Sequence, residues 1–263
     1  MKLAFRIIEV FNQPEKGFRG NTSAVFLLEE ALPDAAMQRI ASDLLQPAST
    51  FLWPHEEDHH YHVRWFAPDS EIGLCGHGSL AAIAYIQGTK EIHLHYRNGV
   101  ITGQRKEDDT ASINLEAITV TGEAKIPEPI AEGLGIPVAG YFTTSNKQII
   151  VVNSEEELLK MEPDFSKLRE SEVFGYAVTA RGEKVDFVSR TLVPHVHQLE
   201  DPATGSSHAA LAPFWSKRLN KNELIAHQLS SRKGLFNCVY HENRVELSGH
   251  YSVLAEGNFF YQE

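Results

Sequence analysis

Two glycine-led segments carry the residues best suited to chemistry in this sequence. Cys75 to Ser79 precedes one apolar run, and Asp201 to Gly205 leads through Ser206 and Ser207 into another. Each pattern is typical of a loop that opens a helix, where unpaired N–H groups and a partial positive charge are exposed. Glycine lets a ligand approach such a backbone closely. Two such ends facing one cleft would hold a carboxylate or a developing enolate.

Three side chains of these segments are candidate catalytic groups. His77 is the titratable group nearest to its helix start. Asp201 precedes Gly205 by four residues and could hold an amine or shuttle a proton, while Cys75 occupies a position that generally favours a thiolate. Each has a plainer interpretation: a hydrogen-bonded loop histidine, a turn-forming aspartate and an inert buried thiol. The helices themselves could be ordinary ones, capped by Ser79 or Thr204.

The sequence lacks the motifs of several other enzyme classes. A cofactor-free racemase with paired thiolates needs a second cysteine in the loop from Asp201 to Gly205, and that loop has none; Cys238 falls in a strand pattern elsewhere. The segment Gly76-His77-Gly78 lacks the third glycine and the βαβ setting of a dinucleotide fingerprint. No Gly-x-Ser-x-Gly elbow occurs.

Histidines are concentrated in one part of the first half. His55, His59, His60 and His62 surround three acidic residues, and His93 and His95 share a face of an expected strand. Alternating histidines can bind zinc, but no closed four-ligand spacing occurs here. A solvated hairpin tip is the favoured interpretation, and no metal site is predicted.

The surrounding elements form two halves with a weak internal repeat. The residues between 119 and 137 hold three prolines and little periodicity, so we predict lobes at 1–118 and 119–263, with the last strands able to return to the first lobe. Each half has a strand that ends at a proline, a loop and an apolar helix, expected at about 76–87 and about 205–219. Residues 61–66 alternate, with His60, His62 and Arg64 on one face. Phe18 to Asn21 is interpreted as a turn.

Composition restricts the partners and the compartment. The 263 residues have a net charge of −11, and no basic cluster exceeds Arg105-Lys106, which argues against a nucleic-acid partner. No apolar stretch approaches the roughly 18 residues of a membrane span. The first ten residues do not resemble a signal peptide, and two cysteines make no disulfide framework. We expect a cytoplasmic protein without a membrane partner.

The same residues resemble the PhzF family, named for an isomerase of phenazine biosynthesis. Gly20-Asn21 with Ala24-Val25, the block from Phe66 to His77, and Ser248-Gly249-His250 with Gly257 are similar to successive parts of its pattern. The segment Glu200-Asp201-Pro202-Ala203-Thr204-Gly205-Ser206 resembles its most specific signature. These matches extend over the full length of the chain.

The resemblance implies a fold, a chemistry and an assembly. The fold would be α+β, with two similar lobes, each a curved, mostly antiparallel sheet or barrel around a central helix, as in diaminopimelate epimerase. The family binds small carboxylic acids without cofactor or metal, usually as a homodimer. Asn21, Gly76, Gly78, Ser79, Gly205, Ser206 and Ser207 would bind substrate, with Asp201, His77 and Cys75 as catalytic residues.

One position departs from the family pattern. Its acid/base is a glutamate in a Ser-Glu-Thr-x-Phe stretch, and the ungapped match places Ala48 there. Alanine cannot move a proton. Either another group moves the proton, or the reaction differs, or the protein only binds a ligand. The leading hypothesis is an isomerase or epimerase-like enzyme that moves a proton on a small carboxylate, next to a carbonyl or across a double bond; the alternative is a catalytically impaired protein that binds a small carboxylate. A structural dimer without a ligand is the third hypothesis.

Overall fold

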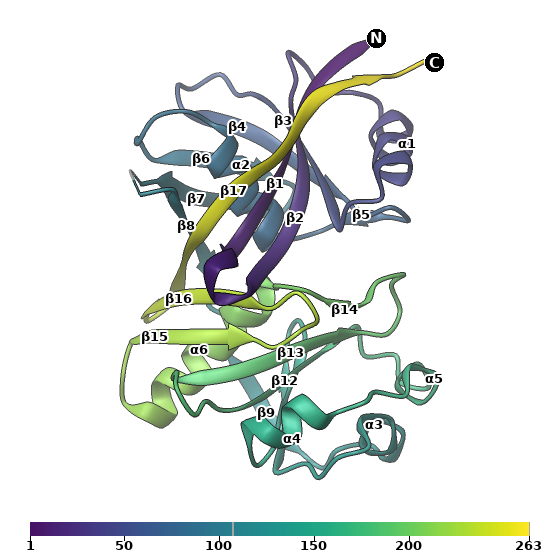
Figure 1. The fold of residues 1–263 in the computed structure, drawn as a ribbon, viewed down its shortest axis with the longest axis vertical. Helices are drawn as coiled ribbons and strands as arrows, with labels where there is room; N and C mark the ends of the chain where they lie inside the picture. The colour runs from purple at the N-terminus through teal and green to yellow at the C-terminus, as the bar shows by residue number, and fades with distance from the viewer. Residues whose placement is uncertain (107, 263) are drawn as a thin grey trace. The chain divides into compact units, whose positions relative to one another are not determined.

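The computed structural model describes residues 1–106 and 108–262, and the chain divides into two units. Unit 1 contains Met1–Leu115 together with the segment from Ser248 onward, and unit 2 contains Glu116–Leu247. The last strand, β17 (Arg244–Phe260), thus ends in unit 1, where it pairs antiparallel with β1 (Lys2–Gln13), as Figure 1 shows. The N-terminal amine donates a hydrogen bond of 2.6 Å to the Tyr261 carbonyl, so the two ends of the chain lie together.

Unit 1 is a curved sheet whose strand pairings form a closed ring. The neighbours pair in the sequence β17, β1, β2, β3, β4, β6, β7 and β8, and β8 pairs again with β17. The remaining elements are η1 (Pro14–Lys16), β2 (Phe18–Leu27), α1 (Asp34–Leu44), β3 (Ala48–Pro54), β4 (His60–Phe66), β5 (Glu71–Ile72), α2 (Gly76–Tyr85), β6 (Ile92–Tyr96), β7 (Gly99–Arg105) and β8 (Thr110–Glu116).

Helix α2 forms the centre of unit 1. All its residues from Gly76 to Ala84 are buried, because small and apolar side chains occupy every face of the helix. It packs against β1, β2, β3 and β7. The outer side of the same sheet carries α1, whose Met37 and Ile40 pack with Phe26 and Phe51 in a separate apolar cluster. Strand β3 therefore has one face toward α1 and the other toward α2.

Unit 2 repeats this arrangement with different residues. Its elements are β9 (Val120–Ala124), α3 (Glu128–Leu134), β10 (Gly140–Thr144), β11 (Gln148–Val151), α4 (Glu155–Lys160), α5 (Phe165–Leu168), β12 (Tyr176–Arg181), β13 (Phe187–Val193), β14 (Leu199–Asp201), α6 (Gly205–Leu219), β15 (Glu223–Gln228) and β16 (Gly234–His241). The residues from Gly205 to Ser216 of α6 are buried. No described helix in either unit is long and apolar enough to cross a membrane.

The internal repeat is visible in the order and direction of strand pairing. In unit 1, β1 is antiparallel to β2, β2 is parallel to β3, β3 and β5 are antiparallel to β4, and β6 is parallel to β4. In unit 2, β10, β11, β12, β13, β14 and β15 pair in the same directions and order. The central helix follows the short strand in each unit, so α2 and α6 are equivalent elements. The predicted fold class is confirmed.

Helix α6 tolerates an internal proline because another segment takes the unused carbonyl. Pro213 has no N–H with which to bond the carbonyl of Ala209, four residues earlier. The backbone N–H of Ile118 donates to that carbonyl instead, at 3.0 Å. The segment that enters unit 2 therefore replaces the hydrogen bond that the proline removes.

Some elements differ from the sequence predictions. Phe18 to Asn21 belongs to strand β2, and the chain reverses earlier at η1, where Gly17 has a left-handed φ of 81°. Helix α2 ends at Tyr85, two residues before the expected end at 87. The residues 119–137, interpreted as a connection, include β9 and α3. Residues 244–248 and 251–260, expected as two strands, are one continuous strand, β17.

A buried histidine stabilises the start of the core around α6. His208 is fully buried, its ring stacks on Phe236 with centroids 3.6 Å apart, and its Nδ1 donates to the Thr204 carbonyl at 2.8 Å. Burial lowers the pKa of His208 to about 4, because the charged imidazolium would lose its hydration. The ring is therefore neutral in the folded protein at pH 7.

This burial predicts a pH-dependent stability. Below about pH 6.5 the unfolded chain binds a proton at His208 and the folded chain does not, so the free energy of unfolding should decrease as the pH falls toward about 4. The expected loss from this one group is about 3 kcal/mol. Urea unfolding of His208→Asn across this range should show a shallower decrease than the unmodified protein, whereas His241→Asn, at an exposed histidine, should not. Equal slopes for all three proteins would contradict the assignment.

Candidate active site

The N-terminus of α2 is capped by a cysteine. Cys75 is extended (φ −126°), and its Sγ accepts a hydrogen bond from the backbone N–H of Gly78 at 3.4 Å. Ser79 does not cap the helix, because its hydroxyl donates back to the Cys75 carbonyl at 2.6 Å. The thiol of Cys75 is thus fixed at the first turn of α2, beside the residue Gly76 that begins the helix.

His77 lies between that thiol and an asparagine from β2. Its Nδ1 is 3.2 Å from Asn21 Nδ2 and 3.6 Å from Cys75 Sγ, and the residue is 6% exposed. The backbone N–H of Thr22 donates to Asn21 Oδ1, so the amide NH₂ of Asn21 is the group that faces His77. Nδ1 of His77 then accepts this hydrogen bond, and the tautomer that fits the contact has its proton on Nε2. This tautomer makes His77 a proton donor at Nε2.

A glycine fixes the position of Asn21. Gly20 has a left-handed φ of 50°, and a Cβ atom at this residue would be 1.9 Å from the carbonyl oxygen of Val10. Any other residue would force β1 and β2 apart at this point. The Gly20-Asn21 pair of the sequence therefore has a structural basis: the glycine permits the close approach of strands that directs the Asn21 amide to His77.

The space around Gly78 is filled by protein side chains. A Cβ atom here would be 2.7 Å from Trp65 Cδ1, 2.9 Å from Thr50 Oγ1 and 3.0 Å from Cys75 Sγ. The small residue at this position is therefore required for packing of α2 against β3 and β4. The predicted contact of Gly78 with substrate stays a prediction, and packing gives a second reason for glycine at this position.

Ala48 lies on the α2 side of β3. Thr50 faces α2, since its Oγ1 lies close to Gly78, and Ala48 is two residues earlier on the same face. Ala48 is fully buried and pairs in parallel register with Ser23, whose hydroxyl donates to the Ala48 carbonyl at 3.0 Å. A longer side chain at this position would thus extend on the same face as the residue that contacts the first turn of α2.

The N-terminus of α6 begins with a different set of contacts. Thr204 is the N-cap residue, but its hydroxyl donates to Asp201 Oδ2 at 2.8 Å and caps no N–H of the helix. Gln228 holds this loop, since its side chain accepts from the Thr204 N–H and donates to the Asp201 carbonyl. The carboxylate of Asp201 is therefore oriented at the end of β14, directly before the helix start.

A buried lysine contacts the first turn of α6. Lys147 is 5% exposed, and its Nζ donates to Ser206 Oγ at 2.8 Å and to Asn146 Oδ1 at 3.1 Å. Ser206 is the second residue of α6, after Gly205, so the ammonium group lies beside the positive end of the helix. Two positive charges of this kind attract an anion to the same place.

Ser207 faces the sheet. It is fully buried, and its Oγ accepts a hydrogen bond of 2.9 Å from Thr191 Oγ1 on β13. Its side chain therefore fixes α6 to the sheet, while its backbone N–H still belongs to the first turn. The structure thus places Asp201, Gly205, Ser206 and Ser207 together in unit 2, and Asn21, Cys75, Gly76, His77, Gly78 and Ser79 together in unit 1.

The two helix starts correspond residue by residue. Cys75 and Thr204 are both N-cap residues, and His77 and Ser206 are both the second residue of their helix. A hydroxyl therefore stands at the position equivalent to the thiol. Cys238 is buried in β16, and burial raises the pKa of its thiol. This arrangement agrees with the sequence argument against a two-thiol racemase.

Two buried charged residues were missed in the sequence. Lys147 lies directly before β11, the strand of unit 2 that corresponds to β2, and the repeat of strand order was the signal that could have revealed it. Glu9 on β1 is 2% exposed; it accepts from Asn12 Nδ2 at 2.9 Å and pairs with Arg19 at 3.8 Å. Both lie in segments that look like ordinary strand edges in sequence.

The packing at Gly78 predicts a sensitive position. Gly78→Ala should lower the free energy of unfolding by about 1–3 kcal/mol, because the added methyl group overlaps Trp65 and Thr50. Gly73→Ala is the matched control, since no atom lies within 4 Å of the place that its Cβ would occupy, and it should change stability by less than about 0.5 kcal/mol. Urea unfolding measures both. An unchanged midpoint for Gly78→Ala would contradict the packing described here.

Comparison with known proteins gives a family for these features. The family model described as a phenazine biosynthesis-like protein (PhzC-PhzF) matches residues 8–257. The chain is 33% identical to an uncharacterized isomerase of Pseudomonas aeruginosa, over 98% of each chain, and 32% identical to one of Halalkalibacterium halodurans, over 92% and 93%.

A solved structure shows the same likeness. The crystal structure of a PhzF family protein from Enterococcus faecalis has a TM-score of 0.90 and 34% sequence identity, and the match covers 99% of this chain and 100% of that one. The strand order, the two buried central helices and the motifs at their N-termini agree with this likeness. The chain belongs to the PhzC-PhzF family of phenazine biosynthesis-like proteins.

Proposed function

We propose that this protein is an isomerase that moves a proton on a small carboxylic acid, next to a carbonyl group or across a double bond, without a cofactor. The family membership and the relatives named as isomerases support the class of enzyme. The substrate class rests on the helix starts, where backbone N–H groups and a buried ammonium group favour a carboxylate.

The contact between Lys147 and Ser206 carries this proposal. A lysine that is 5% exposed has lost most of its hydration, and its Nζ lies beside the helix end that is itself positive. The ammonium group and the first turn of α6 therefore place positive charge at one point, which is a setting that favours an anion. The hydroxyl of Ser206, the ammonium of Lys147 and the first-turn N–H groups of α6 would hold one substrate carboxylate.

Asp201 and His77 are the groups proposed to move the proton. Asp201 would accept a proton from a carbon of the substrate, and the Thr204 hydroxyl, which donates to Oδ2, would hold the carboxylate in position. The resulting enolate would receive a proton on another carbon, or on the opposite face, from Nε2 of His77, and this leaves a transient imidazolate whose Nδ1 accepts the hydrogen bond from the Asn21 amide. The proton on Asp201 then passes to the solvent as His77 recovers one, so the reaction is an isomerisation overall.

Ala48 supports the alternative function, a binding protein. The position is fully buried on the α2 side of β3, and its methyl group cannot exchange a proton. If this lineage depended on a carboxylate there, the remaining residues would bind a carboxylate without changing it. The presence of Asp201 and His77 in defined hydrogen-bonded positions favours the enzyme, since simple binding does not require a titratable pair.

Proton exchange with the solvent separates these functions. In D₂O, the unmodified protein should introduce deuterium into at least one member of a panel of amino, hydroxy and unsaturated carboxylic acids, measured by mass spectrometry. Asp201→Asn and His77→Gln should each reduce the rate by about 10²–10⁴-fold, because each removes a general acid or base.

Matched controls use exposed residues of the same type. Asp69→Asn and His241→Gln should leave the exchange rate unchanged. If the unmodified protein binds carboxylates but exchanges no proton between about pH 5 and 9, and Ala48→Glu introduces exchange, the binding function is correct and the isomerase proposal is wrong.

Lys147 should affect binding more than chemistry. Lys147→Met should weaken binding of the carboxylate selected by that panel by about 10- to 100-fold, since a hydrogen bond to a charged group contributes about 1.5–3 kcal/mol. The value of kcat should change far less than KM. The control Lys217→Met replaces an exposed lysine at the far end of α6. Equal binding by both variants would exclude Lys147 from the carboxylate site.

A further inference from the structure

Five histidines gather at one end of unit 1. His60 and His62 lie on β4, His93 and His95 lie on the neighbouring strand β6, and His55 comes from the turn between β3 and β4. Strands β4 and β6 run parallel with His60 opposite His93 and His62 opposite His95. The alternation of each strand therefore places all four strand histidines on one face of the sheet.

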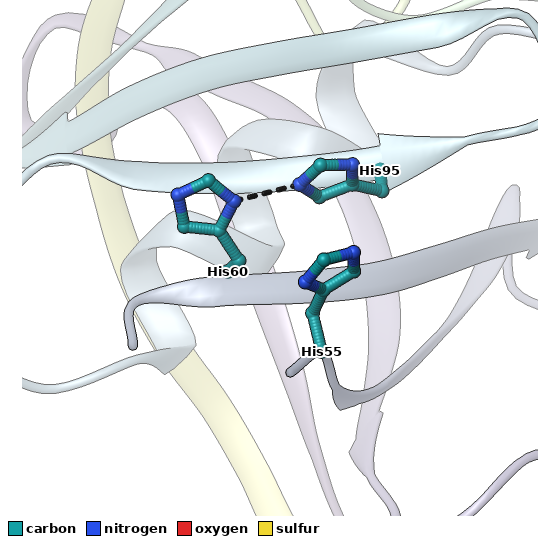
Figure 2. Close-up of side chains that lie close together, drawn as sticks. All are labelled: His55, His60 and His95. Carbon is teal, nitrogen blue, oxygen red and sulfur yellow. Dashed lines mark hydrogen bonds between the residues drawn. The ribbon is translucent and has the colours of Figure 1, made fainter. Parts of the chain in front are cut away.

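Three of these rings come close enough to share one ion. One nitrogen from each of His55, His60 and His95 lies within 4.8 Å of the others. Figure 2 shows these three side chains close together. The Nδ1 of His60 is 2.8 Å from the Nε2 of His95, and the rings of His55 and His95 stack with centroids 4.3 Å apart. No loop of consecutive residues produces this arrangement, because the members are up to 40 positions apart in the chain.

The spacing suits a tetrahedral transition-metal ion. Two nitrogens on one zinc ion, each about 2.0–2.1 Å from it, are about 3.3–3.4 Å apart. Rotation of the imidazole rings by small amounts would bring the three nitrogens to that separation from their present distances. The solvent exposure of His60 is 19%, so the group is accessible without being fully hydrated.

The surroundings of His60 resemble those of a metal ligand. Its second nitrogen, Nε2, is 3.7 Å from the Glu57 carboxylate, while Nδ1 faces His95. Metal-bound histidines commonly donate their other N–H to a carboxylate, which fixes the tautomer.

This cluster is separate from the helix start of α2. Trp65 lies on the face of β4 that contacts Gly78 of α2, and His60 and His62 lie on the opposite face by alternation. A metal at the cluster would therefore not touch Cys75 or His77. The inference below does not depend on the proposed isomerase function.

We propose that His55, His60 and His95 bind one divalent late transition-metal ion, such as zinc, with the fourth position open to water. Imidazole ligands suit zinc, copper, nickel and cobalt, and three histidines with an open position make a recognised zinc geometry. The bound ion links the turn before β4 to β6, so it stabilises this end of unit 1. The hairpin tip that the sequence analysis interprets as solvated would then depend on a bound metal ion for its order.

Metal titration of the full chain tests the site. Protein made without a histidine tag and treated with a chelator is titrated with zinc by calorimetry, and cobalt absorption reports the coordination number. One ion should bind per chain. His60→Gln and His95→Gln should each weaken binding at least about tenfold, and Glu57→Gln by about tenfold through loss of the supporting carboxylate. The control His241→Gln should bind like the unmodified protein.

Each outcome is decisive. Circular dichroism confirms that the variants fold, which these partly exposed positions should permit. Stoichiometric binding that His60→Gln and His95→Gln weaken supports the site, and so does a zinc-induced rise in the melting temperature that is absent from both variants. Absence of stoichiometric binding, or equal binding by His60→Gln and His241→Gln, overturns it. Loss of proton exchange without loss of zinc binding would affect the isomerase proposal alone.

Discussion

A helix enclosed by a curved sheet cannot leave its first-turn N–H groups to bulk water, and this requirement determines the two sites of the molecule. The residues from Gly76 to Ala84 and from Gly205 to Ser216 are buried, so their helix starts need partners supplied by the protein or by a ligand. In α2 the Cys75 sulfur accepts a hydrogen bond from one first-turn N–H group, whereas in α6 the Thr204 hydroxyl donates to Asp201 and caps no N–H group. The first turn of α6 therefore has no side-chain cap, which makes its N–H groups suitable for binding an anion.

The same requirement explains the polar residues beside each start. Asn21 reaches His77 because Gly20 permits β1 and β2 to approach closely, and Lys147 reaches Ser206 from its position directly before β11. A buried amide and a buried ammonium group are costly unless they are hydrogen-bonded. Each of these two groups therefore depends on the hydrogen bond that it makes at its helix start.

Several features followed from the sequence because their physical cause is local. The apolar run after Gly76 predicts a buried helix, the spacing of the two halves predicts the repeat, and the alternation in residues 60–66 predicts the two faces of β4. The predicted second helix already included Pro213. Only the structure shows that the N–H of Ile118 donates to the Ala209 carbonyl, which the proline leaves without its helical partner. The prediction of a turn at Phe18 to Asn21 was wrong, because Gly20 lies within β2 and permits β1 and β2 to approach closely.

Other features depend on residues that are far apart in the chain. No sequence spacing reveals that Lys147 contacts Ser206 or that His55, His60 and His95 share one place, since strand pairing alone brings these residues together. The side of β3 that holds Ala48 likewise depends on which face α2 and α1 cover.

The central claim, that Lys147 and the first turn of α6 hold the substrate carboxylate, is tested most directly by amide chemical shifts in a titration with benzoate, a small aromatic carboxylate. The backbone N–H signals of Gly205 to Ser207 should move to saturation, and Lys147→Met should weaken the dissociation constant that these signals report. Shifts confined to other amides, with the signals of Gly205 to Ser207 unmoved at saturation, would contradict the claim.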